Sequence, residues 1–250
     1  MPALIITISI VTMLMMAVTL VDNVTSSLPP SSQRINLTNV TSDEVGKFYD
    51  EGLTLMTLGK TNEAIGLFDK ALSINPNNTD VLNDKGVALA RLDKFNEAIA
   101  YYDKALAIKP NDTMALGKKG YTLFRLGTTN DTVDVQKLNE AIGLFDKALS
   151  INPNNTDVLN DKGVALARLG HFNEAIAYFD KALSINPNDT LGLGKKGKTL
   201  LRLGMTNDTV DVQKLNEAIG LFDKALSINP NSPDVLNDKK IALDALGRQK

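Results

Sequence analysis

One sixteen-residue phrase, NEAIGLFDKALSINPN, occurs three times in this chain, and its repetition limits what the chain can fold into. The copies begin at Asn62, Asn139 and Asn216, which are 77 residues apart. Residues 79–155 and 156–232 match at 66 of 77 positions. A fixed period is typical of an array of stacked units in which each unit contacts only its neighbours. We therefore expect an extended array rather than one globular core.

Each 77-residue block contains the same pattern twice. An alanine and the proline after it recur at steps of 34, 43, 34 and 43 residues, and a glycine before them recurs at steps of 34, 34, 43 and 34 residues. Apolar residues around the glycine and around the alanine keep the spacing of one face of a helix. Each unit is therefore predicted to consist of two helices. The glycines are Gly52, Gly86, Gly120, Gly163 and Gly197, and the alanines are Ala64, Ala98, Ala141, Ala175 and Ala218.

The ends of these helices are also marked. Each proline ends a helix because it lacks an N–H group and disfavours the helical conformation in the residue before it. Two residues later stands a side chain that accepts hydrogen bonds from the N-terminus of the next helix. Glycine in the first helix and alanine in the second would let the two helix backbones approach closely, so that the helices pair as a hairpin. Neighbouring hairpins must then stack, because one hairpin alone cannot bury both of its faces. The expected caps are Asn78, Asp112, Asn155, Asp189 and Ser232.

This pattern resembles the 34-residue repeat of the tetratricopeptide repeat (TPR) family. In one unit the match consists of Leu82, Gly86, Leu89, Ala98, Tyr102, Ala105 and Pro110. The resemblance extends from about Val45 to Lys250. It implies an all-α fold, a TPR-type solenoid of helical hairpins coiled as a right-handed superhelix, with an N-terminal apolar segment before it. It also implies a protein-binding scaffold.

The chain before the array has two parts. Residues 3–21 carry no charge and would span about 28 Å as a helix, close to the thickness of a bilayer core. We expect residues 1–21 to be a signal peptide or a transmembrane anchor, so that the protein is membrane-anchored facing outside, or secreted. Residues 22–42 are rich in Ser, Thr, Asn and Pro and are expected to form a flexible linker. The solenoid is expected over 43–250, with repeats at about 45–78, 79–112, 113–155, 156–189 and 190–232 and a capping helix at 233–247.

The third and fifth units contain nine extra residues between their helices, TTNDTVDVQ and MTNDTVDVQ. Val135, Leu138 and Ile142 keep helical spacing, with Asp131 as a possible cap. The second helix of these units is therefore expected to begin about two turns early. Insertions in repeat proteins map to one face, which is sometimes the binding face.

Composition excludes several function classes. The net charge is -2 with acids and bases interspersed, so a nucleic-acid partner is not expected. The chain contains no cysteine and one histidine, His171, at a place expected to lie between helices on the surface. No group of residues suggests catalysis, a metal site or a cofactor. We expect a protein that is not an enzyme.

Candidate binding residues follow from the resemblance, because in this family the first helices line a concave groove. Four arginines at regular spacing would suit carboxylate groups or main-chain carbonyls of an extended peptide. Arginine near a helix C-terminus also complements the helix dipole, and this explanation stays open. The candidates are Asn83, Arg91, Tyr121, Arg125, Asn160, Arg168, Lys198 and Arg202.

Two functions are therefore open. The first is an exported or membrane-anchored module that binds a peptide or protein partner in the concave groove, with the membrane contacted through residues 3–21 if they are not cleaved. The second is a structural component of the cell envelope that self-associates through the insert helices.

A further pattern concerns the register between repeats. The sign of one charged residue alternates along successive first helices, so ion pairs could bridge adjacent repeats there. The alternating residues are Asp84, Lys118, Asp161, Lys195 and Asp238.

Overall fold

The computed structural model describes residues 37–129, 132–206 and 210–247, and in these residues every regular element is a helix. The apolar segment 3–21 and most of the expected linker lie outside the described residues. No helix in the described ranges combines the length and the apolar character needed to cross a membrane. The helices are α2 (Leu37–Thr57), α3 (Thr61–Ile74), α4 (Thr79–Arg91), α5 (Phe95–Ile108), α6 (Thr113–Gly127), α7 (Val135–Ile151), α8 (Thr156–Arg168), α9 (Phe172–Ile185), α10 (Thr190–Gly204), α11 (Val212–Ile228) and α12 (Pro233–Gly247).

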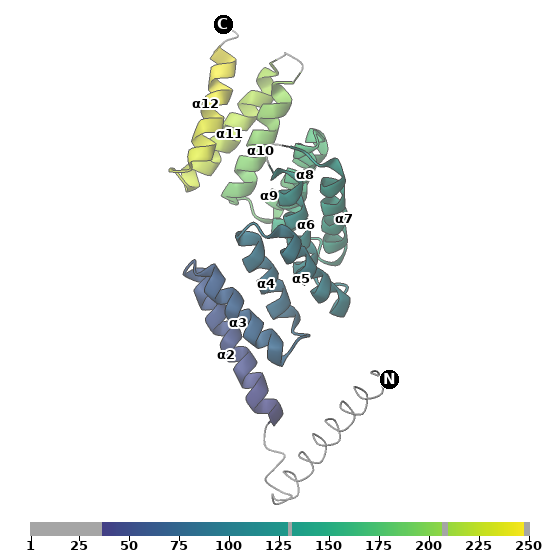
Figure 1. Cartoon of the computed structure of the whole chain (residues 1–250). Coiled ribbons are helices and arrows are strands. Elements are labelled where there is room, and N and C mark those ends of the chain that lie inside the picture. Colours follow the sequence, from purple (N-terminus) through teal and green to yellow (C-terminus); the bar gives the residue numbers. More distant parts are fainter. Residues whose placement is uncertain (1–36, 130–131, 207–209, 248–250) are drawn as a thin grey trace, which may run out of the picture.

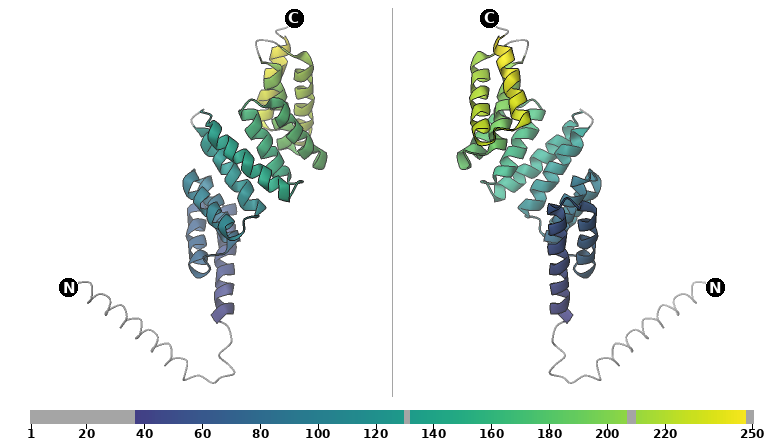
Figure 2. Two further views of the ribbon diagram at one scale, coloured as in Figure 1. Left: turned by 90° about the vertical axis from the view of Figure 1, so that its right-hand side faces the viewer. Right: turned by 90° about the vertical axis from the view of Figure 1, so that its left-hand side faces the viewer.

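The helices form hairpins that stack in chain order. Each pair from α2/α3 to α10/α11 packs as one hairpin, and α12 follows without a second helix among the described residues. Figures 1 and 2 show the hairpins arranged as an elongated, twisted array. The predicted all-α solenoid of helical hairpins is therefore confirmed, and the physical reason is that each hairpin completes its core only against the next one.

Each hairpin is organised around a glycine and an aromatic ring. A Cβ added to Gly86 would lie 2.6 Å from Tyr102 Cε1, and one added to Gly163 would lie 2.7 Å from Phe179 Cε1. The sequence had suggested that glycine makes room for the alanine of the second helix. The structure shows that glycine makes room mainly for the ring, because a buried ring needs more depth than a methyl group; at Gly120 the Ala141 carbonyl oxygen is close as well, 3.2 Å from such a Cβ. The rings of Phe68, Tyr102, Phe145, Phe179 and Phe222 are all buried.

Two kinds of junction alternate between successive first helices from α4 onward. Where α4 meets α6, Asn83 Nδ2 donates to the capping Asp112 Oδ2 at 2.9 Å, and α8 meets α10 in the same way. Where α6 meets α8, Gly117 takes the place of the asparagine, and a Cβ there would lie 3.1 Å from Val158 Cγ2. The two junction types therefore recur with the 77-residue period of the sequence.

The predicted helix caps are present at four of the five places. Asn78, Asp112, Asn155 and Asp189 each accept from backbone N–H groups of the following first turn. Ser232 contributes its carbonyl, which accepts from Leu236 N at 3.0 Å. Pro233 begins α12, as expected for a residue that lacks the N–H group.

The insertions extend the second helices by less than the sequence suggested. Helix α7 has 17 residues, whereas α5 has 14, so the extension is about one turn. The cap is Asp134, whose Oδ1 accepts from Lys137 N at 3.1 Å. Asp131, the predicted cap, lies outside the described residues. The helix starts late because Asp134 N donates to the Gly127 carbonyl at 2.8 Å, which closes the loop directly after α6.

The first helix begins earlier than expected. Helix α2 starts at Leu37, inside the segment 22–42 that was expected to be a linker. Each residue added to an existing helix gains one backbone hydrogen bond. The lower helix propensity of Ser, Thr and Asn costs only tenths of a kcal/mol per residue relative to alanine. A short polar extension of a packed helix is therefore tolerated.

Candidate functional site

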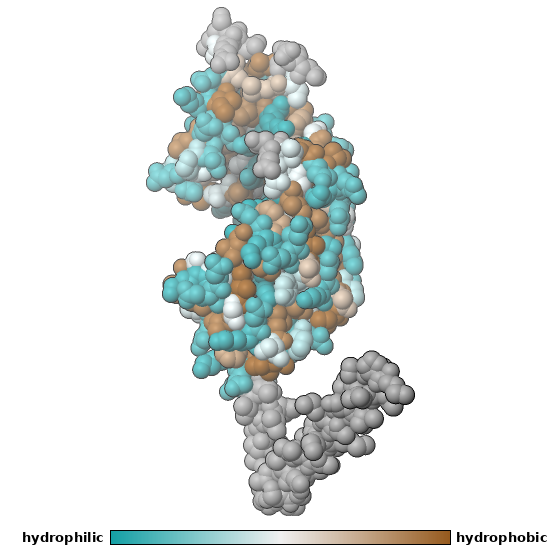
Figure 3. Space-filling view, in the orientation of Figure 1, coloured by the Kyte–Doolittle hydropathy of each residue, from teal (hydrophilic) through white to brown (hydrophobic). Residues whose placement is uncertain are grey.

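An open hollow of about 330 Å³ is lined by the first helices α6, α8 and α10 together with Phe179 of α9. The array is concave, and Figure 3 shows a notch in its surface between the N-terminal and C-terminal hairpins. The hollow has an apolar part and a basic part, and no acidic residue lines it among the described residues. The apolar part consists of Phe124, Val164, Ala167 and Phe179, and the basic part of Arg168, Lys195, Lys198 and Arg202.

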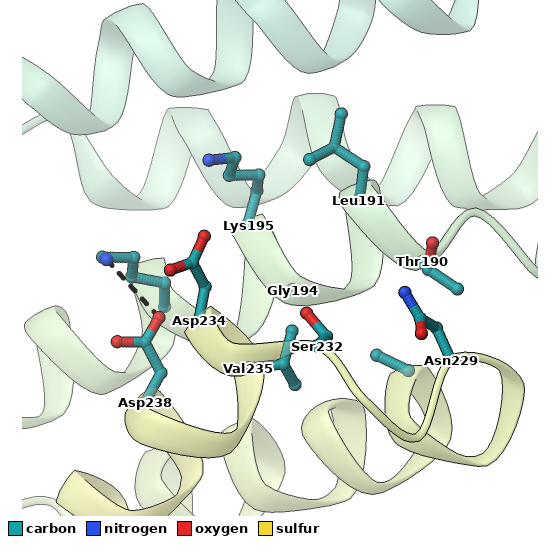
Figure 4. A pocket seen from close by; sticks show the side chains of 11 residues that line it. Thr190, Leu191, Gly194, Lys195, Asn229, Ser232, Asp234, Val235 and Asp238 are labelled. Carbon is teal, nitrogen blue, oxygen red and sulfur yellow. Dashed lines mark ion pairs between the residues drawn. The ribbon is translucent and has the colours of Figure 1, made fainter.

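A second hollow of about 230 Å³ continues this surface between α10 and α12. Lys195 and Lys198 line both hollows. Figure 4 shows Lys195 and Leu191 on α10 and Asp234 and Val235 on α12, which all line this hollow. The dashed line there marks the ion pair between Lys198 Nζ and Asp238 Oδ2, which are 3.4 Å apart. The groove is therefore basic over α8 and α10 and acidic where it reaches α12.

The structure brings three of the eight candidate residues together in the larger hollow, namely Arg168, Lys198 and Arg202. Tyr121 is 41% exposed on α6, with its ring centroid 6.3 Å from that of Phe124. Their roles in binding stay predictions.

Two candidates are placed differently, because they lie inside the stack. Asn83 is 0% exposed and Asn160 is 5% exposed. Each side chain donates to the aspartate that caps the next first helix. Neither amide is accessible to a partner in this structure. Sequence spacing could not reveal this, because the cap that holds each asparagine is 29 residues away in the chain.

Three of the four candidate arginines bind the neighbouring repeat. Arg91 Nη1 donates to the Met56 carbonyl at 3.1 Å. Arg125 Nη1 donates to the Ala90 carbonyl at 3.5 Å, and Arg202 makes the equivalent bond to Ala167 at 3.3 Å. Each acceptor lies near the C-terminus of the preceding first helix, where a positive charge complements the dipole. The helix that these arginines stabilise is therefore the neighbouring one.

Arg168 is the exception. Its Nε is buried and has no hydrogen-bond partner. The acceptor expected from the other repeats is the carbonyl of Phe124, which occupies in α6 the place that Ala90 occupies in α4. That carbonyl accepts from Thr128 Oγ1 at 2.9 Å. Thr128 is the C-cap residue directly after α6 and the first residue of the insertion, so the insertion supplies the hydroxyl group that bonds to this carbonyl.

The ring contacts show the same difference. The Arg125 guanidinium lies 4.9 Å from the centre of the Phe95 ring, and that of Arg202 lies 5.1 Å from the Phe172 ring. The residue at the equivalent place before Arg168 is Leu138, which is fully buried and has no ring. Arg168 therefore lacks both contacts that hold Arg125 and Arg202.

The alternating charges of the first helices do not form a continuous ladder. In the described ranges no ion pair joins Lys118 or Lys195 to a carboxylate within 4.0 Å. Asp84 instead accepts from Tyr49 Oη at 2.6 Å. At the equivalent place before Asp161 the chain has Gly117, so no hydroxyl reaches this carboxylate. Burial raises the pKa of Asp161 to about 7, and the more distant charges of Lys118 and Lys195 oppose this only in part.

This environment predicts an effect of pH on stability. Because the pKa of Asp161 rises from 3.8 to about 7 on folding, the folded state binds the proton more tightly, and stability falls as the pH rises between these values. Asp161→Asn should therefore raise the free energy of unfolding by about 1–3 kcal/mol at a pH of about 8 and by much less near pH 4. Urea denaturation at both pH values measures the difference.

Asp157→Asn is the matched control, because it removes the same charge one turn earlier at an exposed place. It should give no gain at either pH. A gain of equal size at both pH values for Asp161→Asn would contradict the prediction.

The described residues contain no group of three side chains that could hold a metal ion. His171 is exposed and lies 3.1 Å from Glu174 Oε1, at the place between helices that the sequence suggested.

Comparisons with known proteins agree with this architecture. Two models of the tetratricopeptide repeat match residues 49–113 and 156–189. A search of curated proteins found no match. Several solved structures are similar in fold.

One is TTC0263, a thermophilic TPR protein of Thermus thermophilus, with 22% identity and a TM-score of 0.65 over 80% of this chain and 98% of that chain. Another is a tetratricopeptide repeat protein of Parabacteroides merdae, with 17% identity and a TM-score of 0.62 over 82% of this chain and 74% of that chain. A third is YrrB, described as a TPR protein with an unusual peptide-binding site, with 20% identity and a TM-score of 0.55 over 77% and 90% of the two chains.

Proposed function

Because the chain belongs to the tetratricopeptide repeat family and is a protein–protein interaction module, we propose that it binds an extended peptide segment of a partner protein in the groove over α6, α8 and α10. The protein then acts by holding a partner and not by catalysis. The similarity to YrrB, whose description names a peptide-binding site, supports this proposal at the level of the fold.

The observation that carries the proposal is the composition of the larger hollow. It joins an apolar surface around Phe124 and Val164 to four basic side chains. A peptide site needs apolar area for affinity and a few directed polar groups for orientation. A different row of lysines on the first helices is already paired, each with an aspartate of the preceding second helix, as in Lys119 with Asp103 at 2.8 Å.

We further propose that the groove works outside the cytoplasm. The uncharged segment 3–21 supports either tethering to a membrane or export. The partner would then be another protein of the envelope or the exterior.

Affinity capture from the native cells tests both parts. The full chain is compared with the double variant Lys195→Gln, Lys198→Gln, which removes two charges from the groove. We expect at least a fivefold loss of captured partner, because these charges orient the bound segment (about 1 kcal/mol). The matched control is Lys147→Gln, Lys181→Gln, which removes two exposed charges from second helices and should leave capture unchanged.

Equal capture by both double variants would contradict groove binding. Full chain recovered only from the cytosolic fraction of the same cells would contradict the location outside the cytoplasm. The alternative function, self-association through the inserts, is favoured by the exposed Val135 and Val212, which are 56% and 48% exposed at the starts of α7 and α11. Capture of further copies of this chain alone would support that alternative.

A further inference from the structure

We infer that the turns between successive hairpins carry N-linked glycans. This inference rests on the proposed location outside the cytoplasm, and it assigns a modification site to a part of the array that the groove does not use. The attached group is an oligosaccharide, and its donor is a lipid that carries the oligosaccharide on a phosphate group. The modified residues are Asn77, Asn111, Asn154 and Asn188.

The first step of the argument is the acceptor triplet. Nine of the 24 asparagines stand two residues before a threonine, with no proline between them. Asn-x-Thr is the triplet at which exported proteins receive N-linked glycans. Four of the nine lie at described turns that join a second helix to the next first helix. In the fifth such turn Pro233 stands in place of the threonine, so that turn provides an internal control.

The second step is the state of the asparagine side chains. All four are exposed. In the first turn, Asn75 Oδ1 accepts from Asn77 N at 3.2 Å, and Asn78 caps α4. These neighbours hold the turn, whereas the side-chain amide of Asn77 takes part in no hydrogen bond within the described part of the chain. The amide nitrogen is therefore available for modification without loss of a structural contact.

The third step concerns the threonines. Each one is the first residue of a first helix, and the residue before it already supplies the cap. Their hydroxyl groups take part in no hydrogen bond among the residues that the structure describes. Threonine also has a lower helix propensity than alanine. The fold does not require a threonine at these places, whereas the acceptor triplet does.

The chemistry of the attachment is a glycosyl transfer. A bond forms between the asparagine Nδ2 and C1 of the first sugar, and Nδ2 loses a proton. The bond between C1 and a phosphate oxygen of the lipid carrier breaks, and the phosphate leaves with its electron pair. Thr79 is 5% exposed in the folded array, so the transferase must read this triplet during export, before α4 forms.

The surface beside the turns has room for sugars. Asn77 lines an open hollow of about 480 Å³ together with Leu72 and Ile108. Ile108, Ile151 and Ile185 are 41%, 43% and 42% exposed, and each stands three residues before an asparagine of a triplet. Hydrated glycans would cover this apolar edge. None of the four asparagines lines the two hollows of the groove, so the glycans would leave the groove open.

The test begins with the full chain purified from the native cells. After proteolysis, mass spectrometry of the peptides locates any attached sugar. We expect sugar masses on the peptides that contain the four asparagines. The peptide that contains Asn231, which is equally exposed but lies in the turn with Pro233, should carry none.

Two variants expressed in the same cells separate the triplet from its asparagine. Thr156→Ala keeps Asn154 but removes the hydroxyl group, so the mass of the full chain should fall by one glycan. Thr156→Ser is the matched control, because it keeps a hydroxyl group and should keep the glycan. Asn155 still caps α8 in both variants, and circular dichroism should show the helix content of the wild type.

A third variant tests the converse. Pro233→Thr completes the triplet that begins at Asn231, so the chain should gain one glycan at this asparagine. Pro233→Ala is the matched control, because it also removes the proline but creates no triplet. Its mass should differ from that of the wild type only by the substitution.

Unmodified asparagines at all four turns, in chain recovered from the membrane or the exterior, would overturn the inference and leave the proposed location intact. An unchanged glycan mass in Thr156→Ala would overturn it as well. Chain recovered only from the cytosolic fraction would remove both the location and the glycans. Groove binding is judged separately by the capture experiment, because the four asparagines lie outside the groove.

Discussion

Phe145→Ala is expected to lower the free energy of unfolding by about 3–5 kcal/mol, the range found when a buried aromatic ring is removed from a core. The Phe145 side chain is 0% exposed. It belongs to a core cluster that includes Leu116 of α6 and Leu159 of α8, so the cavity would loosen the hairpin and its stacking on the next one. Urea denaturation followed by circular dichroism measures the loss.

The matched control is Ile151→Ala at the end of the same helix, where the side chain is 43% exposed. It should cost about 1 kcal/mol or less. In an array each hairpin is stabilised by its neighbours. The urea unfolding transition of Phe145→Ala should therefore also broaden if the weakened central hairpin lets the two ends of the array unfold separately. A loss no larger than that of the control would mean that the ring does not organise the hairpin.

Gly120→Ala should also destabilise the array, by about 1–3 kcal/mol, although alanine is the better helix former. The added Cβ would lie 2.7 Å from Phe145 Cε1 and 3.2 Å from the carbonyl oxygen of Ala141. The ring cannot move aside without opening the core, so the cost of the steric overlap exceeds the gain in helix propensity. The same denaturation experiment measures the difference.

Gly143 provides an internal control for this prediction. It lies in α7 of the same hairpin, and a Cβ there would meet nothing within 4 Å. Gly143→Ala should therefore stabilise the protein by about 0.5–1 kcal/mol. Opposite signs for the two substitutions support the packing described above, and stabilisation by both would refute it.

Much of the fold could be predicted because it depends on local spacing. The glycine and alanine series predicted two helices per unit, and the caps at Asn78 and Asp112 were predicted from their distance to a proline. The structure confirms these features. The start of α7 was predicted one turn too early, because nothing local distinguishes Asp131 from Asp134 as a cap. The contact that decides between them is the bond from Asp134 to Gly127 across the loop.

The candidate site was less predictable. The concave positions were predicted from the resemblance to the tetratricopeptide repeat family, and this placed Asn83 and Arg91 on the groove. In the structure Asn83 is held by a cap of the next repeat and Arg91 by a carbonyl of the previous one. Both partners are supplied by other hairpins, so the spacing within one hairpin contains no signal for them.

By itself, the sequence determined that this protein is an array of paired helices with a repeat of two hairpins, because helix period, caps and small residues act over short distances along the chain. Only the tertiary structure decided which polar side chains of the first helices are free. The physical reason is that stacking brings each first helix against a neighbour whose hydrogen-bonding groups compete for the same side chains. Arg168 shows this: its Nε has no hydrogen-bond partner among the described residues, whereas the carbonyl that an equivalent arginine would reach, that of Phe124, accepts from Thr128 Oγ1.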